Sequence, residues 1–161
     1  IVADLGAGEG TLSQLLAQRA EHVIAIDHSQ KMVTFGKKLA RENGLANLEY
    51  RLGDIESPPI EDKSVDLAIL SQALHHTTSP LLALQEVHRI LRPNGRVVIL
   101  DLLKHSFEKA RDLYADTHLG FAEVEIADLL EEAGFREVET VIADREEAPP
   151  CFQTLLAVAR K

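Results

Sequence analysis

Short apolar runs alternate with longer amphipathic stretches along most of this chain, and this alternation constrains its fold more than any other feature. The apolar runs predict buried strands at residues 1–5, 23–27, 48–52, 65–70 and 97–102. The stretches between them predict helices at residues 12–20, 30–43 and 80–91. Strands and helices that alternate in this way form βαβ units, so we expect an α/β domain in which helices cover both faces of a parallel sheet.

The pattern changes after Leu103. Helices are predicted at residues 105–116 and 126–133, and two further strands at residues 138–143 and 154–159. The connection between these two strands is too short for a crossover helix, so we expect them to pair as an antiparallel hairpin. With no internal repeat or linker, residues 1–161 are expected to form one domain.

The charge of the chain argues against nucleic acid as its main partner. Lys and Arg number 17 against 26 Asp and Glu, which gives a net charge of −9. Residues 121–150 alone hold ten acids and two arginines, so the remainder is almost neutral. The single cysteine, Cys151, excludes an internal disulfide, and no apolar run reaches the roughly 18 residues that a membrane span needs. We therefore expect a cytoplasmic protein without a membrane span.

A glycine-rich turn, residues 4–10 with the sequence DLGAGEG, lies where the first strand ends and the first helix begins. Glycines allow a sharp turn and let a ligand approach the backbone, and the helix N-terminus favours an anionic group. Ligands bind at this position in open parallel sheets. A tight turn without a ligand is an equally good explanation of the glycines when they are taken alone.

Three carboxylates strengthen the case for a ligand. Asp4 ends the first strand, Asp27 ends the second, and Asp54 follows the third. A carboxylate at Asp27 can accept both hydrogens of a ribose diol, and one at Asp54 can accept from the exocyclic amine of a purine. Each acid alone is also explained as a turn or capping residue, but three in register beside a glycine turn indicate a nucleoside site.

The spacing disfavours a nicotinamide dinucleotide at this site. The dinucleotide fingerprint needs glycine at positions one, three and six, and counting from Gly6 the sixth position is Thr11. Asp4 would also lie near the pyrophosphate, where a negative charge is unfavourable. The same carboxylate is favourable beside a cationic ligand.

Five stretches together resemble the motifs of one enzyme family. They are VADLGAGEG at residues 2–10, AIDHS at 25–29, LGDI at 52–55, DLAILS followed by LHH at 66–76, and LRPNGR at 91–96. The chain resembles the class I S-adenosylmethionine-dependent methyltransferases, within the group that includes the ubiquinone/menaquinone methyltransferases. Asn94 stands where the family's last motif has a glycine. The resemblance implies a Rossmann-like doubly wound sheet of order 3-2-1-4-5-7-6 with strand seven antiparallel.

The same resemblance implies S-adenosylmethionine as cofactor and assigns roles to its neighbours. The implied cofactor-binding residues are Asp4, Gly6, Ala7, Gly8, Asp27, His28, Met32, Asp54, Ile55 and Ser71. The glycine turn would line the methionine part, and Asp4 would hold its ammonium group directly or through water. Asp27 would bind the ribose, with His28 and Met32 against the adenine and sugar. Asp54 and the Ile55 amide would contact the adenine edge, and the Ser71 carbonyl would accept from the ammonium group.

Candidates for catalysis are His75 and His76, in the loop where the methyl group should project. A base is needed only if the acceptor carries a proton that must leave, and histidine titrates in the useful range. The more common explanation of such a histidine is that it packs against the cofactor or caps a helix. No metal site is expected from this pair, because adjacent side chains point in different directions.

The acceptor is expected to be a small molecule, and two other interpretations stay open. One is a non-catalytic domain that senses S-adenosylmethionine, and the other is a nicotinamide oxidoreductase. The stretch from Asp101 to Phe121 resembles methyltransferase domains fused behind winged-helix regulators of the arsenical-resistance repressor type. Because the chain starts at a strand without Met, we expect an N-terminal segment to be missing. A fused N-terminal domain or a homodimer is therefore a candidate partner.

Overall fold

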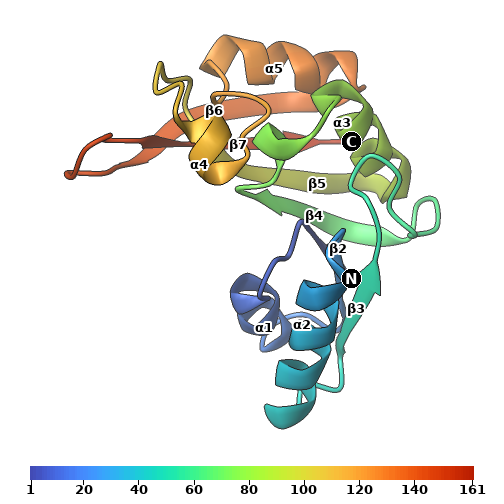
Figure 1. The fold of residues 1–161 in the computed structure, drawn as a ribbon. Coiled ribbons are helices and arrows are strands. Elements are labelled where there is room, and N and C mark those ends of the chain that lie inside the picture. Colours follow the sequence, from blue (N-terminus) through green and yellow to red (C-terminus); the bar gives the residue numbers. More distant parts are fainter.

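A computed structural model describes residues 1–161 as one seven-stranded sheet with helices on both faces (Figure 1). The strands run in the order β3-β2-β1-β4-β5-β7-β6. Their bounds are β1 Val2–Leu5, β2 Val23–Asp27, β3 Leu48–Leu52, β4 Val65–Ser71, β5 Leu91–Leu102, β6 Arg136–Arg145 and β7 Gln153–Arg160. Neighbouring strands from β3 to β5 pair parallel, whereas β7 pairs antiparallel with both β5 and β6. The expected fold class, strand order and final hairpin are all confirmed.

Helices connect most of these strands, but none lies between β3 and β4 or between β6 and β7. Their bounds are α1 Thr11–Ala17, α2 Gln30–Glu42, the 3₁₀ turn η1 Leu74–His76, α3 Pro80–Ile90, α4 Ala110–Tyr114 and α5 Glu123–Glu132. The start of α3 follows the sequence signal: the Ser79 hydroxyl accepts from the Leu82 amide at 3.3 Å, and Pro80 occupies the first turn.

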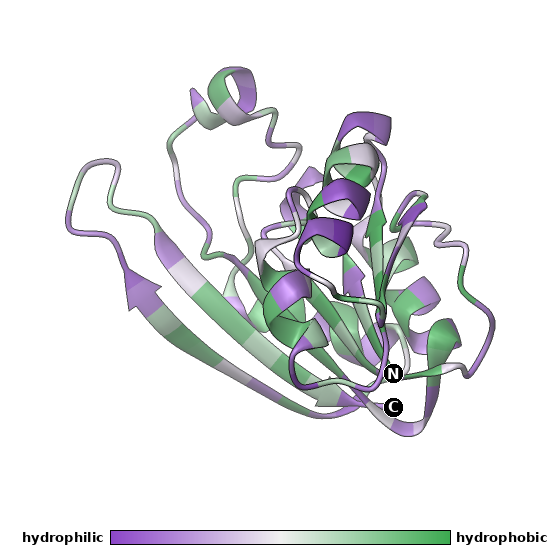
Figure 2. Ribbon diagram, turned by 90° about the horizontal axis from the view of Figure 1, so that it is seen from below, coloured by the Kyte–Doolittle hydropathy of each residue, from purple (hydrophilic) through white to green (hydrophobic).

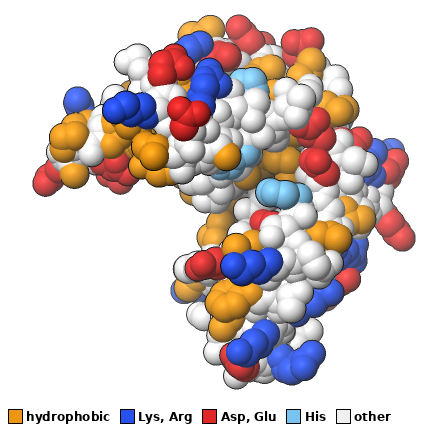
Figure 3. Space-filling model, in the orientation of Figure 1, with side chains coloured by type: hydrophobic (Ala, Val, Ile, Leu, Met, Phe, Trp, Pro, Cys, Tyr) orange, Lys and Arg blue, Asp and Glu red, His pale blue; other side chains and the backbone are white.

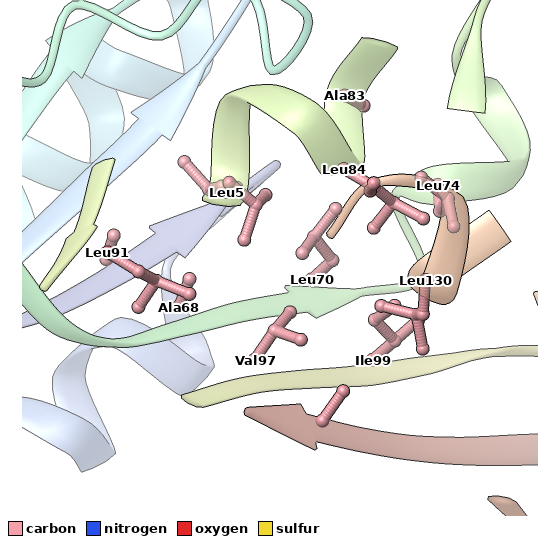
Figure 4. Packing of buried hydrophobic residues seen from close by; sticks show 14 of the residues in the cluster. Leu5, Ala68, Leu70, Leu74, Ala83, Leu84, Leu91, Val97, Ile99 and Leu130 are labelled. Carbon is pink, nitrogen blue, oxygen red and sulfur yellow. The ribbon is translucent and has the colours of Figure 1, made fainter. Parts of the chain in front are cut away.

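Two hydrophobic clusters hold the helices on opposite faces of the sheet. The larger cluster joins β1, β4, β5 and β7 to α3 and α5, and Figure 4 shows Leu70, Leu84, Ile99 and Leu130 meeting there. The smaller one joins β1, β2 and β3 to α1 and α2. Strand β1 contributes to both clusters, because successive residues of a strand point to opposite faces of the sheet: Ala3 and Leu5 belong to the larger cluster and Val2 to the smaller one. Figure 2 shows apolar residues along the strands and polar residues on the outer sides of the helices.

The segment after β5 departs from the sequence prediction. A helix is expected over residues 105–116, but only Ala110–Tyr114 is helical. The residues before α4 are instead bonded to residues after it: Lys104 donates to the Phe121 carbonyl at 3.0 Å and His105 to the Leu119 carbonyl at 3.0 Å. These long-range bonds fold the segment back on itself beyond the end of β5. No helix has the length and apolar character that a membrane crossing requires.

Candidate functional site

A cavity of about 400 Å³ opens at the carboxyl ends of β1, β2, β3 and β4. Its lining consists of Gly6, Gly8, Asp27, His28, Gly53, Asp54, Ile55, Glu56, Gln72, Ala73, His76, Thr77 and Thr78. The molecule is hollowed between the part that carries α1 and α2 and the part that carries α4 and the final hairpin, and histidine side chains lie on the wall (Figure 3). The topology therefore gathers four loops around one hollow, as open parallel sheets do at their ligand sites.

The glycine turn is tied to the end of β2. The amides of Gly6 and Ala7 both donate to the Ile26 carbonyl at 2.9 Å. Gly6 has a φ of +82°, and a Cβ on it would lie 2.5 Å from the Cβ of Ala73. Only glycine fits this left-handed position so close to the loop after β4, so the turn keeps the inner end of the cavity open to backbone contact.

Asp27 is held in a fixed orientation at the cavity wall. One carboxylate oxygen accepts from the Gly8 amide and the other from the Ser29 amide, both at 2.8 Å. The side chain is nearly buried, yet each oxygen keeps a lone pair after accepting one bond. A preorganised acceptor pair of this kind suits two neighbouring hydroxyl groups. Exposed His28 lies beside it, with Nδ1 3.9 Å from the Asp27 carboxylate.

The end of β3 supplies the opposite wall. The Asp54 carboxylate accepts from the Glu56 amide at 2.8 Å and is otherwise exposed to the cavity. The Glu56 carboxylate bridges to the next loop, because it accepts from the amides of Thr78 at 2.6 Å and Ser79 at 3.0 Å. Glu56 thus joins the β3 corner to the start of α3. No motif in the sequence marked this residue.

Asp4 lies behind the glycine turn and does not line the cavity. Its side chain is 1% exposed, and the Ser13 hydroxyl donates to it at 2.5 Å. Burial raises the pKa of Asp4 from 3.8 to about 6, the Ser13 hydrogen bond offsets part of this shift, and the negative charge of Asp27 adds to it. The carboxylate is thus costly to keep ionised when no cation is near.

The structure brings most, but not all, of the predicted residues to the cavity. Gly6, Gly8, Asp27, His28, Asp54, Ile55 and His76 line it, whereas Asp4, Ala7, Met32, Ser71 and His75 do not. Their implied roles stay predictions. The sequence reasoning missed Gly53, Glu56, Gln72, Ala73, Thr77 and Thr78 as lining residues. Their only signal was their place next to the motifs at the ends of β3 and β4.

His75 and His76 have different surroundings. His75 is 4% exposed, and its Nδ1 lies 2.6 Å from the Asp101 carboxylate at the end of β5. Its Nε2 lies 3.5 Å from Asp116, in the loop after α4. His76 lines the cavity with a side chain that is 43% exposed, and its Nδ1 lies 3.9 Å from Asp116.

The divergence expected of these adjacent side chains does not occur. The two imidazole rings have centroids only 3.9 Å apart, because the 3₁₀ turn η1 places both beside the same carboxylate. One ligand atom each from His75, His76 and Asp116 falls within 4.8 Å of the others. The premise on which a metal site was not expected is therefore wrong for this pair.

Comparison with known proteins gives one family. The family model described as "Methyltransferase domain" matches residues 3–99. An arsenite methyltransferase of Halobacterium salinarum is 31% identical over 156 residues, which cover 91% of this chain and 39% of that protein. A ubiquinone/menaquinone biosynthesis C-methyltransferase of Rubrivivax gelatinosus is 32% identical over 100 residues, which cover 62% of this chain and 38% of that protein. The chain thus spans about two fifths of the length of these relatives.

A solved structure also shares the fold. The crystal structure of a SAM-dependent methyltransferase from Aquifex aeolicus superposes with a TM-score of 0.74 at 25% identity. The match covers 98% of this chain and 80% of that one. The agreement extends through the C-terminal strands, which the family model does not reach.

Proposed function

This chain belongs to the class I S-adenosylmethionine-dependent methyltransferase family, and we propose that its cavity binds S-adenosylmethionine and presents the methyl group to a small-molecule acceptor. The observation that supports this best is the wall formed by the glycine turn and Asp27, whose carboxylate is fixed by the Gly8 and Ser29 amides. A fixed carboxylate next to exposed backbone suits a ribose joined to an amino-acid chain. Asp54 then contacts the adenine edge across the cavity.

Methyl transfer from a sulfonium is an in-line displacement in which the donor is already activated. Positioning of the acceptor and exclusion of water therefore supply most of the rate acceleration. The methyl group is proposed to project toward the loop after β4, where Gln72, Ala73 and His76 line the cavity. A proton that leaves the acceptor is taken up on this side, because His76 is the only titratable side chain of that loop that lines the cavity.

The cavity lining of this chain carries no thiolate, the group best suited to the acceptor named for the Halobacterium relative. Arsenite is a soft, thiophilic acceptor that thiolates bind best. The one cysteine here, Cys151, lies between β6 and β7, outside the cavity lining. Within this chain, the cavity offers an acceptor oxygen- and nitrogen-bearing side chains.

Calorimetry with S-adenosylhomocysteine tests the binding half of this proposal. Asp27→Ala is expected to lower the affinity at least tenfold, because it removes the two acceptors for the ribose hydroxyls, while circular dichroism shows a retained fold. Asp128→Asn, which removes an exposed acid on α5, is the matched control and should bind like the wild type. Unchanged affinity of Asp27→Ala would refute the assignment, and NADH binding without S-adenosylhomocysteine binding would replace it with an oxidoreductase.

Transfer of a labelled methyl group tests the catalytic half. Labelled product from S-adenosylmethionine and a cell extract, or from a panel of small-molecule acceptors, supports an enzyme. Tight cofactor binding with no turnover across such a panel favours the second candidate, a domain that senses S-adenosylmethionine for a fused regulator. The resemblance of residues 101–121 to regulator-fused domains is what keeps this candidate.

A further inference from the structure

We propose that His75, His76 and Asp116 form a binding site for one divalent transition-metal ion beside the cavity wall. The three residues come from η1 and from the loop after α4, so the site joins two segments about 40 residues apart in the sequence. The cluster shares only His76 with the cavity proposed for S-adenosylmethionine, because neither His75 nor Asp116 lines it.

The buried carboxylate of Asp116 is the first observation that points to a cation. Its residue is 4% exposed, and neither carboxylate oxygen has a hydrogen-bond partner. An ionised carboxylate buried without a partner is costly, so buried charges in proteins are paired or coordinate metals. The nearest cationic candidates are the two imidazoles, with His75 Nε2 at 3.5 Å and His76 Nδ1 at 3.9 Å.

The hydrogen bonding of His75 is the second observation. Asp101 accepts from the backbone amides of Leu74 at 3.0 Å and Leu102 at 2.7 Å, as an ionised carboxylate does. His75 Nδ1, 2.6 Å from the same carboxylate, therefore carries a proton and donates it. In the neutral ring this leaves a lone pair on Nε2, which faces the oxygen of Asp116.

Two acceptors that face each other at 3.5 Å need a positive charge between them, either a proton or a metal ion. Histidine ligands of metals typically donate their second nitrogen to a carboxylate, which fixes the ring and raises its basicity. The Asp101–His75 pair has this arrangement. It therefore favours the metal ion as the occupant.

The loop that carries Asp116 is fixed opposite the two rings. The His118 amide donates to the His75 carbonyl at 2.8 Å, and the Thr117 hydroxyl donates to the His76 carbonyl at 3.1 Å. These bonds hold Asp116 in register with η1, and the three ligand atoms lie within 4.8 Å of one another. Coordination at ordinary ligand distances of about 2.0–2.2 Å then requires a small inward movement, in which His76 Nδ1 gives up its 3.3 Å contact with the Ala115 carbonyl oxygen.

Two imidazoles and one carboxylate are a ligand set that Zn²⁺ and other first-row divalent ions accept with positions left open. Because His76 also lines the cavity, these open positions adjoin the space proposed for the acceptor. An acceptor hydroxyl bound there would lose its proton more easily. This last consequence rests on the proposed methyl transfer, whereas the binding of the ion does not.

Titration of chelator-treated protein with Zn²⁺ and with Co²⁺ tests the site. We expect one tightly bound ion per chain, and for Co²⁺ the visible absorption bands of a nitrogen- and oxygen-ligated ion. Asp116→Asn and His76→Gln should each weaken binding at least about tenfold. His22→Gln, in which a half-exposed histidine next to Glu49 is changed, is the matched control and should bind like the wild type.

Weak or absent binding to the wild type would overturn the proposal and leave a proton as the occupant. Equal binding by all three variants would overturn it as well, since the ion would then lie elsewhere. If Asp116→Asn fails to fold, His76→Gln decides the outcome, because this side chain is 43% exposed and tolerates the change. Titration of Asp116→Asn with S-adenosylhomocysteine separates this proposal from the cofactor assignment, because Asp116 does not line the cavity.

Discussion

Replacing Asp4 with asparagine should make the free protein more stable at neutral pH and weaken its binding of the cofactor. In the free protein, burial raises the pKa of Asp4 from 3.8 to about 6. The folded state therefore binds this proton more tightly than the unfolded state does. Between about pH 4 and pH 6 the folded protein holds more protons than the unfolded chain, so the contribution of Asp4 to the free energy of unfolding falls as the pH rises.

The size of this effect follows from the shift. A shift of about two pKa units corresponds to about 3 kcal/mol in the free energy of unfolding. The folded wild type loses this amount of stability as the pH rises from about 4 to about 6, and does not regain it at higher pH. In the Asp4→Asn variant the amide side chain keeps an oxygen that accepts from the Ser13 hydroxyl but carries no charge. The difference in stability between this variant and the wild type should therefore grow in favour of the variant from about pH 4 to about pH 6.5 and then level off.

Binding of the cofactor should favour an ionised carboxylate at residue 4, whereas the free protein disfavours it. An ammonium group near Asp4 favours the ionised carboxylate, so binding lowers its pKa and affinity rises as the pH increases through about 6. The wild type should thus bind S-adenosylhomocysteine more tightly at pH 7.5 than at pH 5, and Asp4→Asn should bind it more weakly at pH 7.5, without this dependence.

Chemical denaturation from pH 4 to pH 8 and calorimetry at the two ends of the range measure both effects. Asp128→Asn, the same change at an exposed position on α5, controls for the loss of a surface charge. A stability difference that does not change with pH would show that Asp4 is not an unfavourable buried charge. An affinity for S-adenosylhomocysteine that Asp4→Asn leaves unaltered would refute its role toward the ammonium group.

Three further substitutions test how the fold builds the site. Gly8→Ala should cost about 1–2 kcal/mol of left-handed backbone strain, because a Cβ at Gly8 meets no other atom. Gly10→Ala should cost more, because a Cβ at Gly10 would also overlap the Tyr50 hydroxyl. Equal unfolding midpoints of the two variants would contradict this packing. Leu70→Ala should lower the free energy of unfolding, measured by denaturant titration, by about 2–5 kcal/mol, whereas Leu113→Ala, at an exposed position, should change it very little. A small loss for Leu70→Ala would mean that the core around β4 collapses into the space that the side chain leaves. Glu56→Ala should lower the free energy of unfolding by about 1–3 kcal/mol and weaken cofactor binding, because it leaves the amides of Thr78 and Ser79 without their acceptor. An effect no larger than that of Glu61→Ala would show that these hydrogen bonds do not stabilise the site.

The parallel half of the fold was predictable because its signals are local. Strands β1, β2 and β4 are short, mainly apolar runs, β3 alternates apolar and charged residues, and the α3 start carries a serine cap followed by proline. The prediction of a helix over 105–116 was wrong outside Ala110–Tyr114, because bonds to residues distant in sequence hold the start of this segment. The amides of Lys104 and His105 bond to carbonyls more than a dozen residues away, and no local pattern reports such bonds.

The site shows the same division. Asp27 and Asp54 were predictable because a residue at the carboxyl end of a parallel strand has to reach one edge of the sheet. Glu56 was not, since its role depends on where the start of α3 lies in space. The relation of Asp116 to His75 could not be foreseen either, because it depends on how the loop after α4 folds back onto η1.

The distribution of buried acids indicates what kind of ligand the site is built for. Of the 26 acidic residues only Asp4, Asp27, Asp101 and Asp116 are buried, and all of them lie near the carboxyl edge of the sheet, while the acid-rich stretch 121–150 carries none. Burying a carboxylate costs free energy unless hydrogen bonds or a cation offset the cost. Asp27 and Asp101 have backbone amides as donors, Asp4 has one hydroxyl, and Asp116 has no donor. The two least satisfied carboxylates lie apart, Asp4 behind the glycine turn and Asp116 in the loop after α4, so the ammonium group of the proposed cofactor and the proposed metal ion would each bring a positive charge to one of them.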